Sequence, residues 1–239
     1  MNQPIRLIPF LLLAVFLAVP ALAQQAPSTP WMQFEQELGL ATTYSVDMSI
    51  QAMGMNMDSK IIRDGGKTRT EMVMPFFNLK TVILEIPENG RTVSYSLFPE
   101  KQKYLLNEED DDATPAAAPK IEELGTETVD GVECTKRRIR MTEDGVSSEV
   151  TMWFSPAQKN MPVKMVAAAD VPMQPGQPAM PMQSTILFKN YDFSTPDAAL
   201  FDVPAGYTKI SDMMEVMMDG SGGGLGALMQ QMQNMQVEE

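Results

Sequence analysis

The sequence has 239 residues, with 31 acidic and 18 basic side chains and a net charge of −13. It contains no histidine and a single cysteine, which excludes a Ser-His-Asp triad, a histidine-ligated zinc site and a disulfide framework. The excess of acidic over basic side chains argues against a nucleic-acid partner, because neutralising phosphates requires clustered lysine and arginine.

Residues 1–23 have the pattern of a secretory signal peptide. Arg6 precedes an apolar run from Leu7 to Val19, and Ala21-Leu22-Ala23 fits a small-residue cleavage site. The run is shorter than the roughly 20 residues that a membrane-spanning helix needs. We therefore expect a periplasmic or secreted protein whose mature chain does not span a membrane.

Residues 24–40 are predicted to form a short N-terminal helix. Thr29 and Pro30 fit its cap and first turn, apolar residues follow at spacings of three and four, and Gly39 ends the pattern. At the other end of the chain, residues 211–239 form a Met- and Gly-rich tail that we expect to be helical or disordered.

Residues 41–210 are predicted to form one β domain. Apolar and polar residues alternate with a period of two, and helix-length periodicity is absent between the alternating runs, which favours antiparallel strands. Asp64-Gly65, Asn89-Gly90 and Asp130-Gly131 are hairpin signals because such turns need positive φ. We expect a mainly β protein with a single curved antiparallel sheet that forms an unclosed β-barrel. The eleven candidate strands are 44–50, 57–64, 67–74, 80–86, 92–98, 102–106, 121–129, 132–141, 146–154, 162–169 and 184–193.

Two further segments complete this domain. Residues 107–120 form an acidic, Ala- and Pro-rich stretch that we interpret as an exposed surface loop, since its composition offers little to bury. Cys134 stands within a strand-like run, where a small buried apolar residue is the simplest role for a lone thiol.

Methionine is the one residue type in unusual number, with 22 copies. Met53, Met55 and Met57 alternate, so on a strand their thioethers would share a face and could bind Cu(I), for which soft sulfur ligands are suited. The alternative is that methionine lines a cavity or fills a core, because its unbranched chain adapts to irregular shapes. Both interpretations remain open, and no cofactor and no catalytic residue is expected.

Several stretches resemble the superfamily of LolA, LppX and other outer-membrane lipoprotein-sorting proteins. They are YSVDMSIQAMGMNMDSKIIRDGGKTRTEM, LGTETVDGVECTKRRI, MWFSPAQKNMPVKM and the closing LFDVPAGY. The resemblance covers about residues 40–210 and is closest to an uncharacterised periplasmic branch. It implies an unclosed barrel of about eleven strands, with helices at its mouth and an apolar interior that holds acyl chains.

We therefore expect a non-enzymatic protein that binds a lipid or lipoprotein acyl chain in an apolar barrel cavity. The alternatives are a methionine-based Cu(I)-binding protein and an envelope interaction or sensor protein with a protein partner. The alternation does not fix which strand face points inward. The residues expected to line the cavity are Val46, Met48, Ile50, Met72, Met74, Val82, Leu84, Ile86, Val93, Tyr95 and Leu97.

Overall fold

The computed structural model describes residues 35–52, 54–74, 78–107, 120–143, 146–171 and 180–217. The chain divides into two compact units, residues 1–39 and residues 40–239. In the first unit the described part is helix α2, Glu35–Leu38, which is followed by Gly39 with a φ of +64°. A glycine in this left-handed conformation is a common way to end a helix. The expected signal peptide and helix cap lie outside the described residues.

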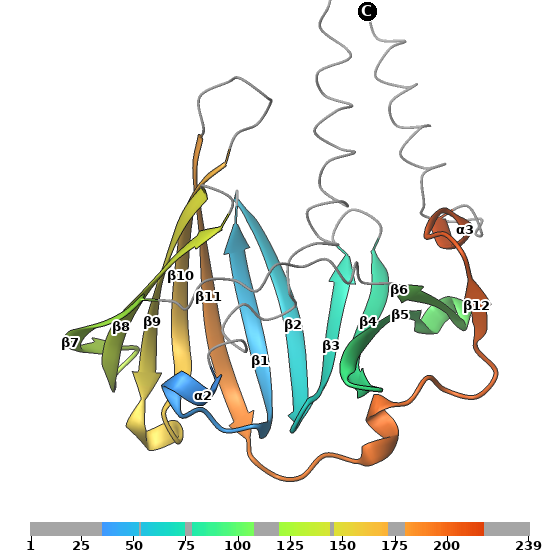
Figure 1. The fold of residues 1–239 in the computed structure, drawn as a ribbon, viewed down its shortest axis with the longest axis horizontal. Coiled ribbons are helices and arrows are strands. Elements are labelled where there is room, and N and C mark those ends of the chain that lie inside the picture. The colour runs from blue at the N-terminus through green and yellow to red at the C-terminus, as the bar shows by residue number, and fades with distance from the viewer. Residues whose placement is uncertain are drawn as a thin grey trace, which may run out of the picture. The chain divides into compact units, whose positions relative to one another are not determined.

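The second unit is built on a single sheet of twelve strands, in the order β12-β6-β5-β4-β3-β2-β1-β11-β10-β9-β8-β7 (Figure 1). Neighbouring strands are antiparallel except for β12, which is parallel to β6. The two outermost strands are not paired with each other, so the sheet is unclosed. The strands are β1 Thr43–Ala52, β2 Met55–Asp64, β3 Lys67–Met74, β4 Leu79–Glu88, β5 Arg91–Phe98, β6 Lys103–Asn107, β7 Lys120–Val129, β8 Val132–Glu143, β9 Val146–Ser155, β10 Met161–Val171, β11 Met180–Asp192 and β12 Thr208–Ile210.

The described helices of this unit are short and stand between strands or after the last one. They are η2 Pro99–Lys101, η3 Pro156–Gln158, η4 Ala198–Phe201 and α3 Met214–Met217. The predicted fold class is confirmed: the protein is mainly β, with one curved, unclosed sheet. All eleven predicted strands are present, and the three-residue strand β12 is an addition that the alternation did not reveal.

Two of the predicted hairpin turns have the expected backbone. Asn89 and Gly90 have φ of +51° and +84°, and Asp130 and Gly131 have φ of +48° and +82°. In each hairpin the flanking strands are joined by these two residues alone. Positive φ at both central positions is what a type I′ turn requires, so Asn-Gly and Asp-Gly are the residues that set the register there.

Two other predictions, the acidic loop and the C-terminal tail, concern segments that lie largely outside the described residues. Asn107 and Lys120, the ends of the predicted acidic loop, are strand residues, and 108–119 lie outside the described residues. In the C-terminal tail only the start is described, where α3 forms. Among the described residues, no helix has the length and apolar character needed to cross a membrane.

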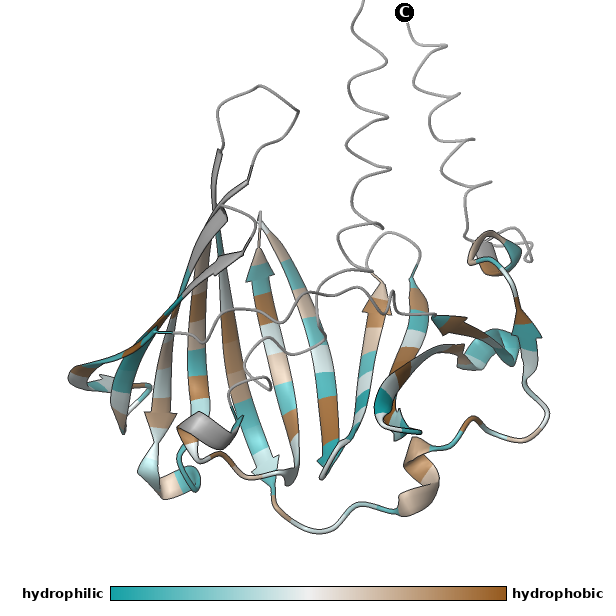
Figure 2. Ribbon diagram, viewed as in Figure 1, coloured by the Kyte–Doolittle hydropathy of each residue, from teal (hydrophilic) through white to brown (hydrophobic). Residues whose placement is uncertain are grey.

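The strand register assigns every side chain to one of two faces. Residues directly opposite each other in antiparallel strands share a face. We call the side that carries Tyr44, Val46 and Met48 the Met48 face, and the side that carries Asp47 and Ser49 the Asp47 face. The alternation of apolar and polar residues along β1 and β2 is visible in Figure 2.

The Asp47 face is apolar over β4 and β5, where the connection from β11 to β12 covers it. Val82, Leu84 and Leu97 are at most 1% exposed and pack with Val203 and Tyr207 of that connection. Beside them, Arg69 Nη1 donates a hydrogen bond to the Leu200 carbonyl oxygen over 2.9 Å. The connection therefore acts as a second layer over this part of the sheet.

On the Met48 face, a separate cluster holds the end of the described chain in place. Leu79, Phe98, Ile210 and Val216 are all buried and in contact. Phe98 and Ile210 come from strands on either side of β6, so burying them together stabilises the short parallel pairing of β12 with β6.

Replacing Leu84 by alanine should lower the free energy of unfolding by about 2–5 kcal/mol, the usual cost of truncating a buried leucine. Leu84 is 0% exposed. The matched control is Ile121→Ala, because Ile121 is 37% exposed, and it should change stability far less. Chemical denaturation of both variants gives the comparison, and equal losses would contradict the assignment of Leu84 to a packed core.

Candidate functional site

The eleven residues predicted to line a cavity lie on both faces of the sheet. Register across β3 and β4 pairs Thr70 with Ile83, so residues 82, 84 and 86 point away from the face that holds Met72. The prediction combined two surfaces because alternation within a strand does not relate one strand's face to the next. On the Met48 face are Val46, Met48, Ile50, Met72 and Met74, and on the Asp47 face are Val82, Leu84, Ile86, Val93, Tyr95 and Leu97.

The Met48 face carries an apolar row that crosses five neighbouring strands. Direct cross-strand pairs link Met152 of β9, Met165 of β10, Ile186 of β11, Ile50 of β1 and Met57 of β2. Met152, Met165 and Ile186 are 0%, 2% and 8% exposed. Four strand spacings of about 4.8 Å give this row a length of about 19 Å.

Further buried apolar side chains flank the apolar row on the same face. They include Val46 and Met48 of β1, Ile61 of β2 and Phe188 of β11. Sequence reasoning missed Met152 and Met165, although both stand in alternating runs. Only the pairing of β9 with β10 and of β10 with β11 places them beside Ile186.

Toward β3, β4 and β5 the Met48 face changes from apolar to hydroxyl-bearing. Arg63 Nη1 donates a hydrogen bond to Thr68 Oγ1 over 2.8 Å. Within the described chain, Ser59 Oγ and Thr70 Oγ1 are buried without a hydrogen-bond partner. The buried hydroxyl side chains are Ser59, Thr68, Thr70, Thr81 and Ser94.

An aromatic group stands at the Tyr44 end of the Met48 face. The ring of Tyr191 lies 5.9 Å from that of Tyr44 and stacks on Phe193 at 5.7 Å. Lys159 Nζ lies 4.2 Å from the centre of the Phe193 ring. Tyr191 donates a hydrogen bond through its hydroxyl to the Pro162 carbonyl oxygen over 2.7 Å. Burial raises the pKa of Tyr191 well above its ordinary value.

A groove of about 600 Å³ lies over β11, β1, β2, β3 and β4. Residues 48, 59 and 72 form one cross-strand row along the middle of the groove. Side chains of the Asp47 face border the groove on either side of that row. Because side chains alternate, that middle row presents its backbone to the groove. Met48 and Met72 are the only predicted cavity residues that line this groove, and six of its thirteen lining residues are charged. The charged residues are Asp47, Asp58, Glu71, Lys60, Lys80 and Lys189.

Hydrogen bonds and an ion pair engage two of the three acids in the groove. Arg69 Nε lies 2.7 Å from Glu71 Oε1, and Asn190 Nδ2 donates to Asp47 Oδ2 over 2.8 Å. Among the described residues, Lys60, Lys80 and Lys189 form no ion pair. The signal for these lysines in the sequence is weak, since a lysine at a polar strand position is ordinary on any solvated face.

The candidate Cu(I) ligands are only partly described. Met55 and Met57 lie on β2, on the Met48 face, and Met53 is outside the described residues. Within the described ranges, no group of three or more cysteine, aspartate or glutamate side chains is placed to hold a metal ion. Cys134 is 0% exposed, as predicted for a buried thiol, and burial raises its pKa.

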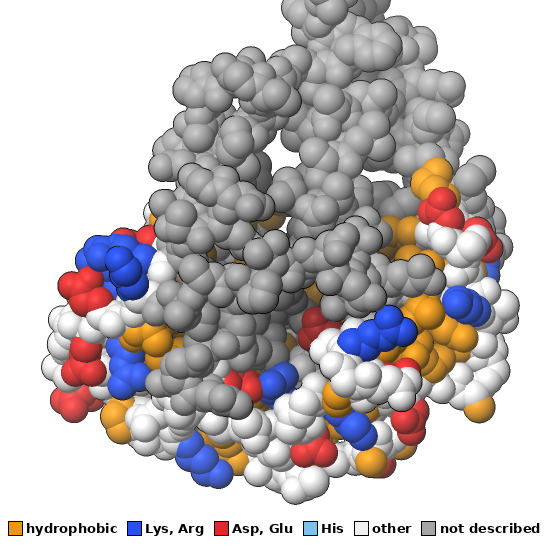
Figure 3. All heavy atoms as spheres, in the orientation of Figure 1, with side chains coloured by type: hydrophobic (Ala, Val, Ile, Leu, Met, Phe, Trp, Pro, Cys, Tyr) orange, Lys and Arg blue, Asp and Glu red, His pale blue; other side chains and the backbone are white. Residues whose placement is uncertain are grey.

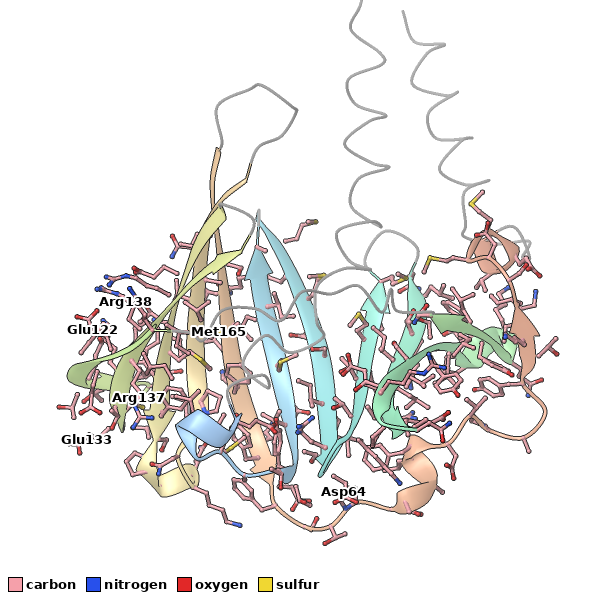
Figure 4. The ribbon with its side chains drawn as sticks, viewed as in Figure 1. Asp64, Glu122, Glu133, Arg137, Arg138 and Met165 are labelled. Carbon is pink, nitrogen blue, oxygen red and sulfur yellow. The ribbon has the colours of Figure 1, made fainter. Side chains whose placement is uncertain are left out.

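The charged side chains of β7, β8 and β9 form an exposed ladder of ion pairs (Figures 3 and 4). Arg138 lies 3.6 Å from Glu122 and 3.1 Å from Glu149, and Arg140 contacts the same two carboxylates. Met165 lies on β10, two strands from β8, and the register continues from Met165 through Met152 to Arg137 of β8 (Figure 4). Each exposed ion pair contributes about 0–1 kcal/mol to folding stability. We therefore interpret the ladder as an ordinary charged surface and not as a binding site.

Comparisons with known proteins give similarity only at the level of structure. No family model and no curated protein matches the sequence. An outer membrane lipoprotein-sorting protein domain from Vibrio parahaemolyticus matches with a TM-score of 0.37 and 12% identity, covering 72% of this chain and 95% of that one. The lipoprotein LppX of Mycobacterium tuberculosis matches with a TM-score of 0.37 and 11% identity, covering 74% and 98%. Both proteins bear names of the group that the sequence resembles, and neither match identifies a ligand or a site residue here.

Tyr191→Phe should destabilise the protein at neutral pH and make its stability less sensitive to alkali. The variant loses the bond to Pro162, worth about 0.5–1.5 kcal/mol. The pKa of Tyr191 is higher in the folded protein than in the unfolded chain, where it is about 10. The protonated hydroxyl therefore contributes fully to folding stability below pH 10, and this contribution is lost as the pH rises above 10. Denaturation at pH 8 and pH 11 should therefore show a smaller difference between wild type and variant at pH 11. An equal difference at both pH values would contradict this role for Tyr191.

Proposed function

We propose that this protein binds a hydrophobic ligand, a lipid or the acyl chain of a lipoprotein, against the Met48 face of its sheet. The observation that carries the proposal is the apolar row from Met152 to Met57, which crosses five strands without a charged side chain. Its length of about 19 Å suits an extended hydrocarbon chain lying across the strands.

The driving force would be the removal of hydrocarbon from water. Each buried CH₂ group contributes about 0.8 kcal/mol, so a long chain binds without a specific polar contact. Methionine supports this role, because its unbranched side chain can repack around ligands of different shape. Three of the five residues in the apolar row are methionines.

The hydroxyl-bearing part of the Met48 face would receive the polar end of such a ligand. Ser59 Oγ and Thr70 Oγ1, buried and without a partner in the described part of the chain, could each donate a hydrogen bond to an ester or headgroup oxygen. A buried hydroxyl without a partner costs roughly 1–3 kcal/mol, which a ligand oxygen or a water would recover.

We further propose that the protein works in the periplasm or is secreted, as residues 1–23 suggest, and that its role is binding rather than catalysis. Binding of Cu(I) by Met53, Met55 and Met57 remains the alternative for the methionine string, and a protein partner in the cell envelope remains a third. Among the described residues, no geometry favours either over a hydrophobic ligand.

The purified protein should bind a fluorescent long-chain fatty acid, and organic extraction of the native protein should release acyl chains detectable by mass spectrometry. Met165→Asn should weaken binding of the fluorescent fatty acid about tenfold or more, because it places an unpartnered amide in the apolar row. Met165→Leu, which keeps the volume and the apolar character, should retain binding.

The matched control is Met214→Asn, the same chemical change at a side chain that is 42% exposed. It should leave fatty-acid binding unchanged. Circular dichroism establishes that each variant is folded. A folded Met165→Asn variant that binds the probe as well as wild type does, or a wild type that binds none, would refute the proposal.

A further inference from the structure

We propose that Arg137 closes one end of the apolar row and thereby limits the length of the acyl chain that the Met48 face accepts. The inference rests on the proposed function, because it concerns the same apolar row. It begins with the strand register, in which Met152 of β9 stands directly opposite Arg137 of β8. The apolar row that runs through Met165 and Met152 therefore ends at a guanidinium group (Figure 4).

Two contacts on the Met48 face hold the side chain of Arg137. Its Cζ lies 5.4 Å from the centre of the Phe154 ring, and Phe154 is 2% exposed. Stacking of a cation on an aromatic face is attractive, because the ring face carries partial negative charge. The Nε of Arg137 also lies 3.8 Å from Oε2 of Glu123, which stands directly opposite on β7. A ligand chain that moved Arg137 aside would have to break both contacts.

The arginine acts in this proposal as a polar barrier, not as a site for an anionic headgroup. Glu123 lies across from it, so the pair carries no net charge. Hydrocarbon that reached the guanidinium would remove water from a charged group, which costs free energy, whereas hydrocarbon laid against Met152 gains it. Favourable contact with an acyl chain therefore stops between Met152 and Arg137.

The polar end of the ligand belongs at the opposite end of the apolar row. Under the proposed function, Ser59 and Thr70 receive that end, and Ser59 lies two residues from Met57 on the same face of β2. The hydrocarbon then runs from Met57 toward Met152, and its terminal methyl group points at Arg137. The length of the apolar row is consequently the length of chain that can be buried.

This length corresponds to a definite class of acyl chain. An extended hydrocarbon advances about 1.25 Å per carbon, because its bonds are about 1.5 Å long and meet at roughly 111°. The row crosses from β9 to β2, about 19 Å, and therefore accommodates about 15 carbons. Replacing Arg137 by methionine extends the apolar surface by one strand spacing, about 4.8 Å, or about four carbons.

The experiment measures how dodecanoic, hexadecanoic and icosanoic acids displace the fluorescent fatty acid from the full chain. With wild type, affinity should rise about fourfold per methylene group up to hexadecanoic acid, and icosanoic acid should bind no more than about twofold tighter. With Arg137→Met, icosanoic acid should bind about tenfold or more tighter than it binds wild type, whereas dodecanoic acid should bind both proteins alike.

Arg138→Met is the matched control. Arg138 is the next residue of β8, and its side chain is 30% exposed, as that of Arg137 is. Because side chains alternate along a strand, Arg138 lies on the Asp47 face, where it pairs with Glu122 and Glu149. The control removes the same charge from the same strand and should leave the chain-length profile of wild type unchanged.

Two further variants of Arg137 separate polarity from size and from effects on folding. Arg137→Leu should shift the profile toward icosanoic acid as Arg137→Met does, so the test does not depend on one variant. Arg137→Gln remains polar and should keep the wild-type profile. Circular dichroism establishes that each variant is folded.

The outcomes distinguish this inference from the proposed function. A wild type that binds none of the three acids refutes both. A normal wild-type profile that Arg137→Met leaves unchanged, or shifts no more than Arg138→Met does, overturns the role of Arg137 alone. Equal weakening of all three acids by Arg137→Met also overturns it, because that result would place the carboxylate of the ligand at Arg137.

Discussion

The constraint on which this fold depends is the length of chain between β6 and β7. These strands occupy the second and the twelfth places in the sheet, ten strand spacings apart, which is about 48 Å along a flat sheet. Thirteen residue steps from Asn107 to Lys120 span at most about 43–47 Å when fully extended. Even a fully extended connection would therefore not reach from β6 to β7 across a flat sheet. The sheet must curve so that its two ends come closer together.

A sheet that curves without closing keeps two edges, and each is protected in a different way. The edge strand β12 has only three residues, which leaves little backbone to pair with another chain. The edge strand β7 is ten residues long, and its glutamates pair with arginines and a lysine of β8, while Gly125, at φ +96°, marks an irregularity in the register. Charges and a bulge on an exposed edge discourage further strand pairing, so the ion-pair ladder is better explained by edge protection than by ligand binding.

The sequence was sufficient to predict eleven of the twelve strands and two of their tight turns, but not which face of the sheet each side chain occupies. Alternation predicts which residues of one strand share a side, and Asn89-Gly90 fixes how β4 meets β5. Leu84 and Met72 look alike in that pattern, yet they lie on opposite faces, because β4 buries its apolar side under the connection that carries Val203 and Tyr207. That covering segment lies more than a hundred residues further along the chain, and no local pattern indicates where it packs. Strand β12 was missed for the same reason, since its pairing with β6 depends on a distant cluster around Phe98.

The groove and the apolar row are consequences of one alternation. Asp47 precedes Met48, Ser59 precedes Lys60 and Glu71 precedes Met72, so neighbouring residues supply the groove on one side and the Met48 face on the other. A slip of one residue in the register of β2 would exchange Lys60 with Ser59 and move a charge onto the buried face. Burying an unpaired lysine is far more costly than exposing a serine, so the charges that border the groove also hold the register that keeps the apolar row continuous. Lys60 itself points away from the apolar row, so replacing it would change the groove directly and the apolar row only through the register of β2.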